Sequence, residues 1–136
     1  MSRRLTAPPD ADFDARVRAS FAKQGAMATM GATLEQVEPG RVVVLLPHSA
    51  QVSQQHGFVH AGMVAAAMDS ACGYAASTLM HADAAVLTIE FKLNLLAPAD
   101  GEYLVAEDQV LKTGRNLVIT RGEVYAIRKG QAIHFA

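Results

Sequence analysis

The chain has 136 residues, the length of one ordinary domain, and residues 1–136 are expected to form a single domain. Hydrophobic residues make up 51% and charged residues 18%, whereas an average domain has about 25% charged residues. A domain of this size buries only about two thirds of its unfolded surface. The excess apolar surface therefore predicts contact with lipid or with a second subunit. A single cysteine excludes a disulfide framework.

The charge balance gives no support for a nucleic-acid partner. The formal net charge is −1 and aromatic residues make up 6% of the chain, so both a basic surface and stacking platforms are lacking. The first ten residues carry positive charge, but the apolar run of a secretory signal does not follow them. The sequence thus predicts a cytoplasmic protein.

Residues 10–25 are expected to form the first helix. Asp10 or Asp12 would cap it, and Gly25 would end it. Apolar residues recur at four-residue spacing, at Phe13, Val17 and Phe21. The exposed face would carry the charged residues Asp14, Arg16, Arg18 and Lys23.

A β-hairpin is expected next, because two β-prone runs at 32–37 and 41–47 flank the turn tripeptide Glu38-Pro39-Gly40. Residues 61–80 then form a long run of small and apolar residues with one charge, Asp69, near its centre. A mid-membrane Asp costs about 2.5–3.5 kcal/mol, and alanine supplies little hydrophobic drive. The run therefore predicts a helix buried in protein and no membrane span.

Four strands are expected after this helix, at 86–96, 102–112, 117–128 and 131–136, with a bulge at Gly122. In the first of them Leu87, Ile89, Phe91, Leu93 and Leu95 alternate with Val86, Thr88, Glu90, Lys92 and Asn94. Strands on both sides of one apolar helix predict an α+β fold in which a curled antiparallel sheet surrounds a central helix. Such a sheet leaves its edges open, which favours pairing with a second copy of the chain.

Asp69 is the most informative residue, since an isolated carboxylate in an apolar helix is rarely buried without a purpose. The start of the same helix presents unpaired N–H groups and a positive dipole end, which suit a carbonyl oxygen that becomes an oxyanion. Positions 61 and 69 are about 12 Å apart along a helix axis. One carbonyl cannot touch both groups in one subunit, so the Asp is expected from the partner of a dimer.

The segment from Gln54 to Ala76 resembles the active-site signature of hotdog-fold acyl-CoA thioesterases, in the PaaI-like (phenylacetate-pathway) branch of the 4-hydroxybenzoyl-CoA thioesterase superfamily. That signature has Asn or Gln, then a Gly three residues later, then His-Gly-Gly, and an acid nine residues after the His. Here Gln54, Gly57, His60-Ala61-Gly62 and Asp69 fit these spacings. Ala61 stands where a Gly is usual. The last strand ends at Ala136, earlier than in the family, which predicts that a few terminal residues are missing.

The resemblance implies a function and roles for these residues. The chain would hydrolyse an acyl-CoA thioester to a free acid and CoA, without a cofactor, as a homodimer or a dimer of dimers (a homotetramer). The Ala61 amide would polarise the carbonyl, and Asp69 would be the general base or the nucleophile. Gln54 would orient the water or the carbonyl, and Thr88 would lie near the acid. His60, Gly62 and His56 are expected to contact the substrate. Because CoA carries phosphates, basic residues should meet them, and a cluster at the two late turns offers Lys112, Arg115, Arg128 and Lys129; a solvated turn explains these residues equally well.

Other candidates carry less weight. The histidines lack metal-ligand spacing, so no metal site is expected, and the main role of His60 is expected to be structural. Cys72 has no cationic partner in sequence reach and is interpreted as a small core residue. Two alternatives to hydrolysis are a non-catalytic acyl-CoA or fatty-acid binder and an enoyl-thioester hydratase. The second would pair the Asp with a His five residues later, where this chain has Tyr74.

Overall fold

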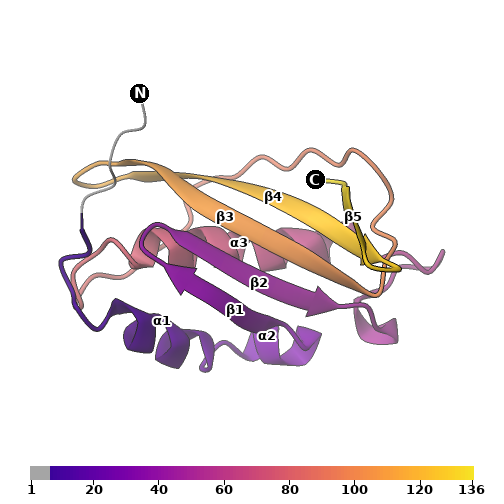
Figure 1. Ribbon diagram of the computed structural model, residues 1–136, viewed down its shortest axis with the longest axis horizontal. Helices are drawn as coiled ribbons and strands as arrows, with labels where there is room; N and C mark the ends of the chain where they lie inside the picture. Colours follow the sequence, from indigo (N-terminus) through magenta and orange to yellow (C-terminus); the bar gives the residue numbers. More distant parts are fainter. Residues whose placement is uncertain (1–6) are drawn as a thin grey trace.

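The computed structural model describes residues 7–136. The prediction that no secretory signal opens the chain concerns residues 1–10, of which 1–6 lie outside the described residues. In chain order the elements are α1 (Phe13–Phe21), α2 (Gly25–Met30), β1 (Thr33–Glu38), β2 (Arg41–Pro47), a short 3-10 turn η1 (Ala50–Val52), α3 (Ala61–Ser77), β3 (Tyr103–Thr113), β4 (Val118–Arg128) and β5 (Gln131–His134). Figure 1 shows the strands laid across α3.

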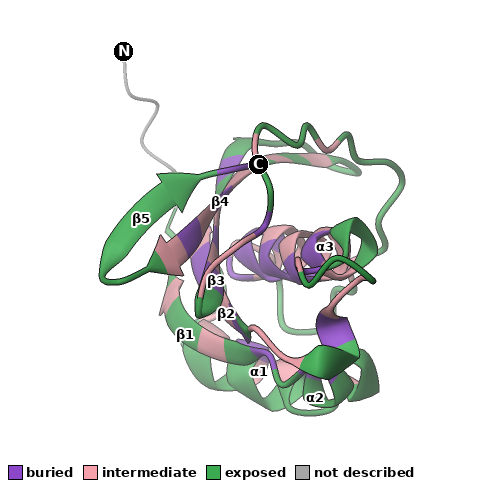
Figure 2. Ribbon diagram, turned by 90° about the vertical axis from the view of Figure 1, so that its right-hand side faces the viewer, coloured by how far each residue is buried: buried purple, intermediate pink, exposed green. Residues whose placement is uncertain are grey.

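The strands form one antiparallel sheet in the order β1-β2-β3-β4-β5. Seen end-on, the sheet curls around α3, and α1 and α2 lie below the helix (Figure 2). The predicted curled sheet around a central helix is therefore confirmed. The core lies between them, where small residues of α3 let the strands approach closely. Its buried side chains include Val42, Val44, Leu46, Val64, Ala67, Ala71, Ala75, Leu104, Ala106, Val124 and Ala126.

The first helix is shorter than predicted and is followed by a second one. The prediction that Gly25 ends a helix is wrong, because α1 ends at Phe21 and Gly25 begins α2. Met27 and Met30 of α2 are buried, so tertiary packing stabilises a helix of only six residues. That helix ends at Gly31, whose φ of 69° suits a glycine.

Arg16 was expected on the exposed face of this helix, but the structure places it half-buried against the end of α3. Its Nη1 donates to Ser77 Oγ at 2.9 Å, and its Nη2 donates to the backbone oxygens of Ser77 at 3.0 Å and Met80 at 3.2 Å. Asp10 accepts from Nε at 2.7 Å. These contacts tie α1 to the carboxyl end of α3, which stops at Ser77 instead of residue 80.

The strand predicted over 86–96 does not form. The segment is extended, but its one backbone hydrogen bond to the sheet region runs from Leu96 N–H to Phe135 O, at 2.6 Å. The side chains on both of its faces are exposed to solvent; the exposed fraction is 89% for Leu87 and 77% for Ile89. The edge strand β5 has only four residues, so one chain offers this segment no ladder along most of its length.

Two smaller expectations are also corrected. The bulge lies between Val110 and Lys112, and Gly122 pairs regularly with Asp108. The helix was expected to be buried in protein, but in one chain α3 buries only the side that faces the sheet and α1. Its other residues are half-buried or exposed. Large apolar side chains are also exposed at the far end of the β3–β4 hairpin, namely Leu111, Leu117 and Ile119.

Candidate functional site

Asp69 lies in the middle of α3, on the side turned away from the sheet, and is half-buried. It lines a cavity of about 400 Å³ between α1, α3 and the segment that follows α3. Most of the other polar groups in this cavity come from the two helices, namely Arg16, Ser20, Ser70, Tyr74 and Ser77, and Gln24 joins them from the N-cap of α2. We call it the Asp69 cavity.

Thr88 is held next to Asp69, near which the family resemblance implied it would lie. Its hydroxyl donates to Asp69 Oδ1 at 2.6 Å. This bond spans nineteen residues and orients one carboxylate oxygen, which leaves the other oxygen available to a water or a substrate. Charge-assisted hydrogen bonds of this kind fix a carboxylate more firmly than neutral ones.

The start of α3 is built by His60, its N-cap residue. The His60 Nδ1 accepts from the Gly62 N–H at 2.8 Å, so a neutral ring carries its proton on Nε2. The Met63 and Val64 N–H groups donate to His60 O. The Ala61 N–H has no hydrogen-bond partner within residues 7–136 and stands at an exposed position. The expected structural role of His60 agrees with this geometry.

The residues around Ala61 form a second cavity of about 380 Å³, which we call the Ala61 cavity. It is mainly apolar and is lined by Gln54, Gln55, Phe58, Val59, His60, Ala61, Val64, Leu95, Ala97, Pro98, Ala99 and Phe135. Gly57, with a φ of 88°, makes the tight turn of the loop that precedes the helix. In this loop the Gln54 side-chain oxygen accepts from the exposed His56 N–H, and its amide nitrogen has no hydrogen-bond partner within residues 7–136.

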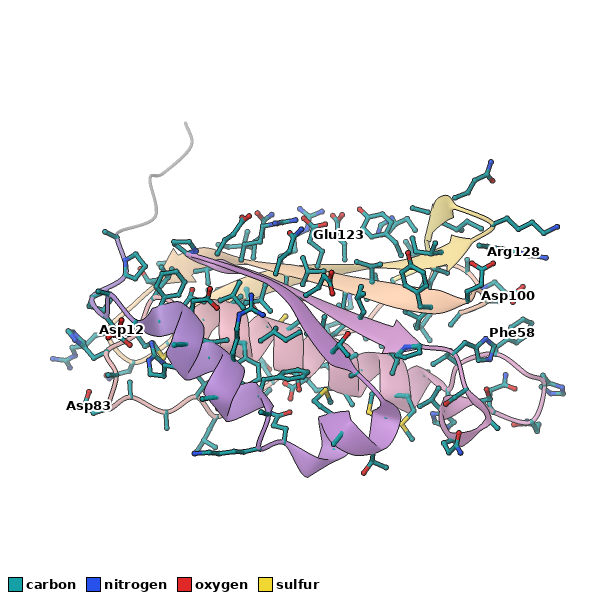
Figure 3. All side chains as sticks on the ribbon, turned by 60° about the horizontal axis from the view of Figure 1, so that its bottom comes forward. Asp12, Phe58, Asp83, Asp100, Glu123 and Arg128 are labelled. Carbon is teal, nitrogen blue, oxygen red and sulfur yellow. The ribbon has the colours of Figure 1, made fainter. Side chains whose placement is uncertain are left out.

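The two halves of the predicted site do not meet in one chain. Gln54, His60 and Ala61 line one cavity, whereas Asp69 and Thr88 line the other. Figure 3 shows the separation: Phe58, of the Ala61 cavity, and Asp83, whose neighbours Ala82 and Ala84 line the Asp69 cavity, lie toward opposite ends of the molecule. This agrees with the expectation that one carbonyl cannot reach both groups in one subunit.

The four basic residues expected at the late turns do not form one cluster. Lys112 and Arg115 lie at the β3–β4 hairpin, whereas Arg128 and Lys129 lie at the β4–β5 turn, at the other end of the long strand β4. Arg128 also donates to Asp100 at 3.1 Å, and these two side chains lie side by side in Figure 3. The two turns follow each other in the sequence, but the length of β4 separates them in space.

One buried acid was missed. Asp108 is fully buried on the face of β3 that packs on α3, and Cys72 Sγ donates to its Oδ1 at 2.7 Å. The alternation of buried Leu104, Ala106 and Val110 along the same face was the signal that could have found it. Burial, first, and the neighbouring Asp108 raise the pKa of the Cys72 thiol to about 12, so this cysteine stays protonated at neutral pH.

Within residues 7–136 no helix combines the length and apolar character needed to cross a membrane. Among the same residues no group of three or more His, Cys, Asp or Glu side chains is arranged to hold a metal ion.

Comparison with known proteins places this site in a family. The sequence profile of the Thioesterase superfamily matches residues 56–133, which include Asp69 and the start of α3. The chain belongs to the thioesterase superfamily. A protein of Saccharolobus solfataricus named as a candidate esterase is 32% identical over 87 residues, which make up 64% of this chain and 61% of that protein's length.

Solved structures agree with this assignment. A thioesterase family protein from Silicibacter pomeroyi is 47% identical, with 90% of each chain covered and a TM-score of 0.89. The PaaI protein from the phenylacetic acid degradation operon of E. coli is 19% identical, with 91% of this chain and 88% of that chain covered and a TM-score of 0.78. The second likeness concerns the fold alone. The predicted hotdog fold is thereby confirmed.

Proposed function

We propose that the chain is an acyl-CoA thioesterase whose reacting site is completed between two copies. The observation that carries this proposal is the split of the site: the Asp69 cavity holds the carboxylate and Thr88, and the Ala61 cavity holds the free N–H at the helix start. Membership of the thioesterase superfamily supports thioester hydrolysis as the reaction class.

Each half supplies what the other lacks. The Ala61 N–H, at the positive end of the α3 dipole, would donate to the thioester oxygen as it gains negative charge. The partner's Asp69 would take a proton from the water that attacks the carbonyl carbon, or would attack it directly to form a mixed anhydride. In either route the C–S bond breaks and CoA leaves as its thiol. Gln54, with its free amide donor, would orient the water or the carbonyl.

The segment 86–96 supplies the surface on which two copies would pair. It is extended, its backbone groups are almost unpaired, and its apolar side chains on one face are exposed. Antiparallel pairing of two such segments would satisfy the backbone groups and cover Leu87, Ile89 and Phe91. Because Thr88 belongs to this segment and lines the Asp69 cavity, pairing would place this cavity next to the partner subunit. A homodimer, or a dimer of dimers, therefore follows from the same proposal.

The first test is release of CoA thiol from a panel of aromatic, medium-chain and short-chain acyl-CoAs. Wild type is expected to hydrolyse at least one of them, and Asp69→Asn is expected to lose at least about 100-fold in kcat, because the isosteric amide cannot take a proton. Equal rates for the two proteins would remove Asp69 from the chemistry. Tight binding of acyl-CoA that is recovered uncleaved would favour a non-catalytic binder.

A second test separates a shared site from one inside a single chain. Ala61→Pro removes only the polarising N–H, since Pro suits the first position of a helix and His60 has ψ of 134°, which a following Pro tolerates. Asp69→Asn and Ala61→Pro are each expected to be inactive alone. Unfolded and refolded together, they should regain about a quarter of the wild-type rate, because half of the dimers carry one intact site. No recovery in refolded mixtures that contain mixed dimers would contradict the shared site.

A further inference from the structure

Asp108 occupies a niche that the sheet leaves open for it. Its side chain has 0% exposure and lies on the face of β3 that packs on α3. The residue paired with it on β4 is Gly122. A Cβ at that position would overlap Asp108 Oδ1 and would also crowd the Met68 methyl group at 2.9 Å. The glycine is therefore required by the carboxyl group, and the two residues form one built feature.

The hydrogen bonds of this carboxyl group are incomplete. Oδ1 accepts from the Cys72 thiol at 2.7 Å, and the buried Oδ2 has no partner within residues 7–136. Asp108 takes part in none of the ion pairs found among those residues. A thiol is a weak donor, so an ionised carboxylate would be poorly compensated here. Burial, first, and nearby Glu107 raise the pKa of Asp108 to about 7, although the Cys72 bond lowers it.

The groups that face Asp108 are few. On α3 these are Met68 and Cys72, with Asp69 on the same turn, and Asp69 also adds negative potential at the Cys72 thiol. On β3 the adjacent Glu107 points to the opposite face, and the paired residues on β2 and β4 are the uncharged Val42 and Gly122. The charged neighbours are thus both acids. The surroundings favour the protonated form of Asp108.

The turn of α3 over residues 68–72 links Asp108 to the proposed site. It carries Met68 and Cys72 on its inner side, against the niche, and Asp69 on its outer side, in the Asp69 cavity. Because a helix turn is rigid, a shift of the inner contacts moves the outer carboxylate as well. The inner contact at Cys72 is made by Asp108.

We propose that Asp108 is a positioning residue for Asp69: its neutral carboxyl group lets the 68–72 turn pack on the sheet without water, and its ionisation places a charge with an unpartnered oxygen in the niche, opens the turn to water in spite of the Cys72 bond, and stops hydrolysis at alkaline pH. The proposal rests on the function proposed above, in which Asp69 acts on the thioester. It assigns to Asp108 no contact with substrate.

The test compares wild type with Asp108→Asn, which keeps the shape of the side chain and cannot ionise. In wild type, kcat on a cleaved acyl-CoA, corrected for spontaneous hydrolysis, should fall about tenfold between about pH 6 and about pH 8, as a single group ionises. In Asp108→Asn it should change less than about twofold, with KM nearly unchanged in both. A merely structural Asp108 would leave the shape of the profile alone.

A matched double variant guards against a simple packing effect. In the double variant Asp108→Ala with Gly122→Ala, removal of the carboxyl group leaves room for a methyl group at position 122. This protein should also lack the alkaline decline, with a lower kcat at every pH because the Cys72 thiol loses its acceptor. A decline that persists in both variants, or one that is absent from wild type, would overturn the proposal.

Hydrogen exchange decides the matter without reference to activity. After correction for the intrinsic pH dependence, amides of the 68–72 turn in wild type should exchange about tenfold faster at about pH 8 than at about pH 6, and those in Asp108→Asn equally at both. If the exchange protection of these amides in wild type does not change with pH, the positioning role is overturned. If no thioester is cleaved by wild type, the proposed function fails, and this measurement still reports on Asp108.

Discussion

At the residue scale, two carboxyl groups on neighbouring elements have opposite surroundings. Asp69 is half-buried, accepts from the Thr88 hydroxyl and lines a cavity. Asp108 is fully buried, bonded to a thiol, and has one oxygen without a partner in the described chain. The first environment suits a group that reaches a substrate, and the second suits a neutral carboxyl group. The two aspartates are the same residue type in the sequence, and only their surroundings in the fold distinguish them.

We expect Thr88→Val to reduce kcat by about tenfold while KM stays nearly constant. The change removes the donor at 2.6 Å from Asp69 Oδ1 but keeps a branched side chain. Thr88→Ser is the matched control, since it keeps the hydroxyl and should retain most of the activity. Loss of activity in both variants would indicate that the methyl group matters and not the hydrogen bond.

Asp108 also makes stability depend on pH. Its pKa is raised in the folded chain to about 7 from 3.8, so the folded state holds a proton that the unfolded state releases. The stability is full below the unfolded value and is lost as pH rises toward about 7. Denaturant unfolding should therefore show wild type losing roughly 4 kcal/mol across this range. The loss should be smaller in Asp108→Asn, and equal losses would contradict the assignment.

At the element scale, α3 is fixed at both ends by side chains. The His60 ring caps its first turn by accepting from the Gly62 N–H. Arg16 satisfies carbonyl groups at its other end, at Ser77 and Met80, and carries a positive charge suited to the negative end of the helix dipole. Thr78, fully buried, adds a bond from the Gly40 N–H at 2.7 Å. The position of Asp69 at mid-helix is therefore set by contacts about two turns away on either side.

Arg16→Lys should destabilise the fold by about 1–3 kcal/mol although the charge is kept. Lysine cannot reproduce the planar fork that bonds Ser77 Oγ, Ser77 O and Met80 O together. Denaturant unfolding at neutral pH measures the change. Arg18→Lys is the matched control, because Arg18 bonds Asp14 on the exposed face and should change stability by less than about 0.5 kcal/mol.

At the scale of the whole molecule, one chain leaves a large apolar surface uncovered. Leu87, Ile89 and Phe91 are exposed along the unpaired segment, and Leu111, Leu117 and Ile119 at the β3–β4 hairpin. Exposed apolar surface of this kind marks an interaction site. It corresponds to the excess of hydrophobic over charged residues in the composition.

Ile89→Lys should yield a monomer, because it places a charge in the centre of the face on which two copies would pair. Sedimentation should show a single-chain mass where wild type shows at least twice that mass. The monomer should keep its circular dichroism but lose hydrolysis. Glu90→Lys, on the other face of the same segment, is the control and should stay associated. An active monomer would contradict the shared site.

The sequence by itself determined the features that depend on local pattern. The spacing from Gln54 to Asp69 indicated the family and a candidate site, and the run of small residues located α3 to within three residues. The family resemblance also implied that Thr88 would lie near Asp69. These features follow from helix and strand periods and from one charge in an apolar run, which a single chain records directly.

The tertiary structure decided the rest. The segment 86–96 alternates like a strand but stays unpaired, because its possible partner β5 has only four residues. The length of β4 separates Lys112 and Arg115 from Arg128 and Lys129. The pairing of Asp108 with Gly122 and its contact with Cys72 join three segments that are distant in sequence. The alternation along β3 indicates which of its faces is buried, but the partners of Asp108 and the division of the candidate site between two cavities depend on long-range contacts that leave no periodic signal.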